Sequence, residues 1–167
     1  MHFPLHPETP PEGRSLADMF GGRDLGPIHA RLERLMDAEG LPHVPRTHTY
    51  NSRLAQELGK WADTQPGFEG IHDALYRAYF AENRNIGDIE VLVDVARSVG
   101  LPADQVGDAL RQRRFKEAVD ADWAKSRMEG VTGVPTFVSG HARVVGAQPY
   151  EVLDQLVVHD GARRTNS

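Results

Sequence analysis

Apolar residues recur at intervals of three and four positions through most of the chain between residues 15 and 130. This spacing gathers them on one face of a helix, so the pattern predicts a series of amphipathic helices. Ser15 and Asp88 are expected N-caps, and Gly40 and Gly100 are expected helix stops. The predicted helical segments are 16–20, 25–36, 54–61, 68–79, 89–99, 104–111 and 115–130.

The pattern changes after Gly130. Two short β-prone runs, Thr136–Val138 and Ala142–Val145, are joined by Ser139–Gly140–His141, which predicts a β-hairpin. Pro149 is suited to the first position of a final helix. The apolar face of that helix is expected to comprise Tyr150, Leu153, Leu156 and Val157.

The N-terminal segment Met1–Gly13 is too rich in proline for a helix. His2, Phe3 and Leu5 are consistent with a short strand that is followed by a loop containing proline. The predicted order is therefore one strand, a block of helices, a hairpin and a last helix. This order favours an α/β domain that carries a helical insertion over two independent domains.

The chain has 167 residues and a net charge of −5, which argues against a nucleic-acid partner. Its apolar runs are far shorter than the roughly 20 residues that span a bilayer, so no membrane partner is expected. The N-terminus has no basic stretch followed by an apolar one, so it does not resemble a secretory signal. We therefore expect a cytoplasmic location.

The sequence contains no cysteine. Its residues therefore offer no disulfide, no thiolate nucleophile and no cysteine ligand for a metal. The eight histidines form no HExxH motif and no recognisable ligand cluster, so no metal site is expected. The sequence also indicates no catalytic residue.

The most informative segment is GVTGVPTF, residues 130–137, in which Pro135 stands directly before a β-prone run. Together with VVGAQPYEVLDQL it resembles the C-terminal half of the DsbA-like thioredoxin family. The similar branch includes FrnE-type oxidoreductases and proteins named 2-hydroxychromene-2-carboxylate isomerase. HDALYRAYFAENRNIGDIEVLVDVARSVGL and TYNSRLAQELGKWA resemble the helical insertion of that branch, and FPLHPETPPEG resembles its second strand and following loop.

This resemblance implies a thioredoxin-like fold with a large helical insertion. Residues 1–14 and 126–160 are then the thioredoxin-like portion, residues 15–125 the inserted helical domain, and residues 161–167 a frayed tail. In the family the peptide bond before the proline is cis and faces the substrate. Val134 and Pro135 are therefore the expected contacts for an incoming peptide or thiol compound.

The family's Cys-x-x-Cys or serine motif, which follows the first strand, has no counterpart here. Ser15 is the first serine, and it follows the segment that resembles the second strand, so we interpret it as a helix cap. The fold class that we expect thus lacks the first strand and helix. Loss of that central strand predicts exposed sheet edges and self-association through them.

Two further positions are candidate substrate contacts by resemblance. Asn51 begins a predicted helix, and in glutathione-using relatives an asparagine in a similar place borders the pocket; a plain helix cap is the alternative. Gln148 follows Ala147 where kappa-class glutathione transferases have a Ser/Asp pair that holds glutathione. The acidic partner is missing, so we expect no cofactor and no tight glutathione binding in that mode.

Three functions stay open at this point. The first is a DsbA-like thiol–disulfide oxidoreductase family member, with this chain redox-inactive because it lacks cysteine. The second is a glutathione-dependent isomerase or kappa-class-like transferase of the same fold. The third is a non-catalytic module that binds peptides. The first of these functions follows most directly from the resemblance. Whether the chain is an enzyme depends on which of the three functions it has.

Overall fold

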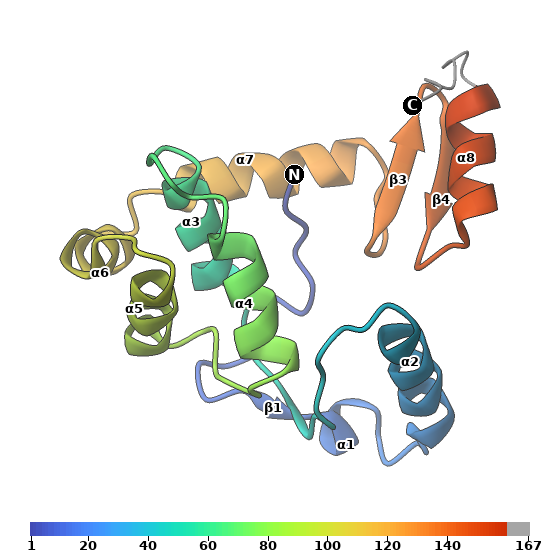
Figure 1. Cartoon of the computed structure of the whole chain (residues 1–167), viewed down its shortest axis with the longest axis horizontal. Helices are drawn as coiled ribbons and strands as arrows, with labels where there is room; N and C mark the ends of the chain where they lie inside the picture. The colour runs from blue at the N-terminus through green and yellow to red at the C-terminus, as the bar shows by residue number, and fades with distance from the viewer. Residues whose placement is uncertain (160–167) are drawn as a thin grey trace. The chain divides into compact units, whose positions relative to one another are not determined.

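The computed structural model describes residues 1–159, and helices dominate it (Figure 1). The frayed tail predicted for residues 161–167 lies outside the described residues. In chain order the elements are β1 (Arg14–Ser15), α1 (Leu16–Met19), α2 (Gly26–Ala38), β2 (His48–Thr49), α3 (Arg53–Ala62), α4 (Ile71–Phe80), α5 (Ile89–Ser98), α6 (Ala103–Arg111), α7 (Lys116–Met128), β3 (Thr136–Ser139), β4 (Ala142–Val145) and α8 (Tyr150–His159).

The chain divides into two compact units. One unit comprises Met1–Leu5 together with the residues from Asp122 onward, and the other comprises His6–Ala121. The second junction between them falls within α7. The domain boundaries expected from the sequence, after residues 14 and 125, stay a prediction.

Helices α3 to α6 enclose the hydrophobic core of the 6–121 unit. Each of these helices contributes at least one large side chain that is buried, because each has an apolar face at helical spacing. Burial of such a side chain stabilises the fold by roughly 1.5–3 kcal/mol. Fully buried large side chains, one from each helix, are Leu58, Ile71, Leu92 and Leu110.

The capping residues expected from the sequence are confirmed. The Ser15 hydroxyl accepts a hydrogen bond from the Asp18 amide, so Ser15 caps α1. The Asp88 carboxylate caps α5 by accepting from the Glu90 amide at 2.8 Å. Gly100 follows α5 with a φ of +82°, a conformation that glycine adopts at little cost.

The small sheet formed by β1 and β2 was not predicted. These strands pair antiparallel, with Arg14 opposite Thr49 and Ser15 opposite His48. Segment 41–50 lies between two predicted helices, and two residues in each strand are too few to produce an alternating pattern. Only contact between the two distant segments creates this pairing.

The strand expected around Phe3 and Leu5 is wrong. Pro4 has no amide hydrogen to donate to a neighbouring strand. The Leu5 amide instead donates to the Phe3 carbonyl at 3.0 Å, which turns the chain locally. The His2 amide donates to the Asp122 carboxylate at 2.8 Å, so this segment is held by α7 rather than by a sheet.

The hairpin is confirmed, with one refinement. Strands β3 and β4 pair antiparallel from Thr136 opposite Val145 to Ser139 opposite Ala142. Ser139 therefore belongs to the strand, and the loop is Gly140–His141 alone. Gly140 has a φ of +54° at the first central position, where type II′ hairpin turns place glycine. Helix α8 packs against both strands.

Candidate functional site

The loop that leads into β3 is built at the end of α7. The helix stops with a Schellman motif, in which the Gly130 amide donates to the Arg127 carbonyl and the Val131 amide to the Ser126 carbonyl. Gly130 has the left-handed φ, +65°, that this motif requires. Arg143 of β4 then donates to the Glu129 carbonyl at 2.6 Å, which fixes the loop to the hairpin.

Val134 and Pro135 lie at the end of this loop, and the peptide bond between them is cis, as the resemblance implies. The Pro135 carbonyl accepts from the Gly146 amide at 2.8 Å, and the Thr136 hydroxyl donates to the Gly133 carbonyl at 2.6 Å. Within the described residues, neither the amide nor the carbonyl of Val134 has a hydrogen-bond partner. The Val134 side chain is 48% exposed. The backbone here therefore offers a free donor and a free acceptor to a ligand.

Main-chain groups that do not pair with β4 continue along the outer edge of β3. Because the carbonyl of Pro135 points toward β4, the main-chain groups of Thr136 and Val138 point away from it, as those of alternate residues do in antiparallel strands. No charged side chain interrupts β3, whereas Arg143 stands on β4. The outer edge of β3 is therefore the edge with which an extended peptide could pair as an additional strand.

Gln148 lies at the same end of the hairpin as Pro135. It follows Gly146, which pairs with Pro135, and its side-chain amide donates to the Val145 carbonyl at 2.7 Å. The structure thus brings Val134, Pro135 and Gln148 into one short region. Their role as substrate contacts stays a prediction.

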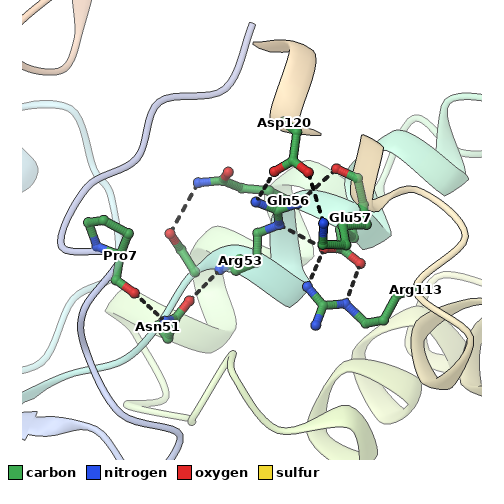
Figure 2. Close-up of polar contacts among 9 residues, drawn as sticks. Pro7, Asn51, Arg53, Gln56, Glu57, Arg113 and Asp120 are labelled. Carbon is green, nitrogen blue, oxygen red and sulfur yellow. Dashed lines mark hydrogen bonds and ion pairs between the residues drawn. The ribbon is translucent and has the colours of Figure 1, made fainter. Parts of the chain in front are cut away.

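Asn51 belongs to the other unit, where its side chain uses both of its donor hydrogens internally (Figure 2). Its amide nitrogen donates to the carbonyls of Pro7 at 3.1 Å and Thr9 at 2.9 Å. Its oxygen accepts from the Arg53 amide at 2.9 Å and so caps the first turn of α3. Asn51 thus stabilises the start of α3 from the position before its N-cap residue, Ser52, and a contact with substrate stays a prediction.

We expect Asn51→Ala to destabilise the 6–121 unit by about 0.5–2 kcal/mol, the range for loss of a cap. The carbonyls of Pro7 and Thr9 then also lose their donor. Chemical denaturation of the variant measures the change. An Asn51 variant as stable as the wild type contradicts this role.

A buried carboxylate that the sequence analysis did not single out lies on α3. Glu57 is 1% exposed and accepts hydrogen bonds from two arginines (Figure 2). Arg113 binds it through two nitrogens, at 2.8 and 2.7 Å, and Arg53 binds it at 2.7 Å. Arg53 also contacts the carboxylate of Asp120 on α7 at 2.8 Å. The cluster ties α3 to the start of α7 and to the loop between α6 and α7.

A sequence signal for this cluster did exist. Glu57 is three residues after Leu54 and four before Trp61, which places a charge on the apolar face of α3. A charge there is rarely buried unless it is paired. The sequence did not identify the partners, because Arg113 and Asp120 come from distant segments.

Opposing influences act on the pKa of Glu57. Burial raises the pKa, but hydrogen bonds and charge from Arg113 and Arg53 outweigh it and hold the pKa below the usual glutamate range. Asp120 has its pKa lowered by Arg53 and Lys116. Glu57 is therefore ionised at neutral pH and completes an internal ion cluster. Its geometry serves structure, since both of its oxygens are occupied by arginines.

We expect acid to destabilise the 6–121 unit through Glu57. A lowered folded-state pKa contributes stability that is present above the ordinary glutamate pKa of about 4.3 and is lost as pH falls through the folded-state value. Denaturation at about pH 7 and about pH 3 measures the loss. The Glu57→Gln variant should lack this pH-dependent contribution to stability. If the free energy of unfolding depends on pH in the same way in variant and wild type, the prediction is contradicted.

No group of three or more His, Asp or Glu side chains among residues 1–158 is arranged to hold a metal ion. Among the same residues, no helix combines the length and apolar character needed to cross a bilayer.

Comparison with known proteins decides the family. A sequence model described as the DSBA-like thioredoxin domain matches residues 1–158. The chain belongs to this family. The match covers the helical block and the hairpin alike, so the expected fold class is confirmed as a thioredoxin-like α/β fold with a large helical insertion. The absence of the first strand and helix stays a prediction.

Solved structures agree with membership of the DSBA-like family. A probable DsbA oxidoreductase, SCO1869 from Streptomyces coelicolor, is 29% identical with a TM-score of 0.80, over 96% of this chain and 74% of that one. A candidate protein disulfide isomerase from Nitrosomonas europaea is 17% identical with a TM-score of 0.61, over 95% of this chain and 76% of that one. The second likeness concerns the fold alone.

Among curated proteins, the uncharacterized protein YwbO of Bacillus subtilis is 32% identical over 108 residues. That region is 56% of this chain and 54% of YwbO, so the match spans about half the length of the curated relative.

Proposed function

We propose that residues 1–167 perform the substrate-binding part of a DsbA-like thiol–disulfide reaction, in which the loop before β3 holds an extended peptide or thiol compound. The supporting observation is the main chain of Val134, whose free donor and acceptor stand at the start of an uncharged strand edge. An extended peptide that adds to this edge gains main-chain hydrogen bonds from Val134 onward. Family membership supports the same assignment.

The chemical step requires a thiolate, which attacks one sulfur of a disulfide and releases the other. These 167 residues contain no cysteine. The chain by itself is therefore proposed to bind without exchanging disulfides, and it should not reduce insulin disulfides above background. Reduction by the purified chain in the absence of added thiol contradicts the proposal.

Binding is tested with a short unstructured peptide whose single cysteine is a mixed disulfide with glutathione. Chemical shifts of backbone amides should change at residues 133–138. Val134→Pro removes the donor and should weaken binding about two- to tenfold, the value of one hydrogen bond. Val134→Ala keeps the main chain and is the matched control. Equal weakening by both variants, or none by either, contradicts main-chain pairing.

The same experiment separates the two alternatives. A glutathione-dependent isomerase or transferase predicts that reduced glutathione alone shifts resonances near Gln148. A non-catalytic peptide module predicts binding of the cysteine-free peptide with equal affinity. Self-association through the β3 edge would occupy the same main-chain groups of Val134 and Val138 as a bound peptide. It therefore predicts that peptide binding weakens as protein concentration rises.

A further inference from the structure

A cavity of about 410 Å³ lies between α2 and α4 in the 6–121 unit. Its volume falls in the range typical of small-molecule sites. Helix α2 has no buried residue, although its apolar positions recur at helical spacing. The side chains that line the cavity are Leu32, Met36, Leu41, Pro42, Asp73, Tyr76, Arg77 and Phe80.

Local backbone bonds build the apolar wall on the α2 side. Helix α2 ends in a Schellman motif, in which the Gly40 amide donates to the Asp37 carbonyl at 3.1 Å and the Leu41 amide to the Met36 carbonyl at 2.8 Å. Gly40 has the φ of +63° that this motif needs. This motif commonly brings its two flanking apolar side chains together, and here those residues, Met36 and Leu41, both line the cavity.

The opposite wall is aromatic and is anchored to the same loop. The rings of Tyr76 and Phe80 stack with centroids 6.2 Å apart on α4. The Val44 amide donates to the Phe80 carbonyl at 2.9 Å, and the guanidinium of Arg46 lies 5.0 Å from the Phe80 ring. The loop after α2 is thereby fixed to the end of α4, so the cavity exists before any ligand arrives.

Two opposite charges stand on α4 at this cavity. Asp73 and Arg77 are one helical turn apart, and both are exposed. Among the side chains described, those of residues 1–158, neither has an ion-pair or hydrogen-bond partner, including the other. Side chains at this spacing have Cβ atoms about 5–6 Å apart, so one small ligand can meet both.

We propose that this cavity binds an apolar α-amino acid, with the side chain between α2 and α4, the ammonium at Asp73 and the carboxylate at Arg77. Charge complementarity selects this class. A carboxylate without an ammonium meets the repulsion of Asp73, and an amine without a carboxylate meets that of Arg77. A zwitterion satisfies both charges while its apolar part leaves water.

The test uses three probes with the same apolar body: L-phenylalanine, 3-phenylpropionate and phenethylamine. Each is titrated into the full chain, and shifts of backbone amides in residues 32–42 and 73–80 are followed. L-phenylalanine should bind most tightly. Each probe that lacks one charge should bind up to about fivefold more weakly, the range for an exposed ion pair.

Variants assign the charges. With Asp73→Asn, L-phenylalanine should no longer bind more tightly than 3-phenylpropionate. With Arg77→Gln, it should no longer bind more tightly than phenethylamine. Asp104→Asn and Arg97→Gln, on α6 and α5, are matched controls that should change neither ratio. Both pairs change exposed residues, so the fold should persist, and unchanged dispersion of the amide spectrum verifies it. The proposal is overturned if all three probes bind with equal affinity. It is also overturned if no amide resonance shifts at probe concentrations well above about 1 mM.

Discussion

Glu57→Gln is expected to lower the free energy of unfolding of the 6–121 unit by about 3–5 kcal/mol, the usual cost of removing one member of a buried ion pair. Glutamine has nearly the same shape as glutamate, so the change isolates charge. Without the carboxylate, Arg53 and the bidentate Arg113 lose their shared partner, at 2.7–2.8 Å, inside the protein. The expected loss is a large share of a typical stability of about 5–15 kcal/mol.

Urea denaturation followed by helical circular dichroism measures this loss. Glu90→Gln is the matched control, because Glu90 pairs with Arg111 at 3.1 Å while both side chains are more than half exposed. It should cost under about 1 kcal/mol. Comparable losses in the two variants would mean that burial does not strengthen the Glu57 cluster.

Leu92→Ala is expected to destabilise the same unit by about 2–5 kcal/mol. Leu92 has no exposed surface, and α5, which carries it, packs against α3, α4 and α6. Truncation therefore leaves a cavity that no single helix can close. The loss includes both the transfer of apolar atoms and the unfilled volume.

Thermal or chemical denaturation measures this effect as well. Ile28→Ala, on α2, is the control, since Ile28 is 64% exposed and alanine favours helices. Its effect should stay within about 0.5 kcal/mol. A Leu92 variant that loses less than 1 kcal/mol contradicts the assignment of Leu92 to the centre of this core.

Features with a local cause were predictable from the sequence. Ser15 and Asp88 cap helices because their side chains reach amides two or three residues ahead. Gly140 marks the hairpin, because the turn needs a positive φ at its first central residue. The segment around Val134 was found by resemblance, since a proline before a strand says little alone.

Features that depend on distant segments were not predictable. The pairing of Arg14 with Thr49 joins positions that no periodic pattern connects. Glu57 was detectable as a charge on an apolar face, but its arginine partners were not. The strand expected near Phe3 fails because alternation alone cannot supply a neighbouring strand to bond.

Arg113 follows the end of α6 with a φ of +53°, in a position of the Schellman motif where glycine is usual. The backbone therefore favours glycine at position 113, but glycine has no side chain with which to bind Glu57. We therefore expect substitutions at positions 57 and 113 to be coupled. Replacing Arg113 by glycine is costly while Glu57 is charged, but becomes tolerable once position 57 is apolar, so relatives should exchange both residues together or neither.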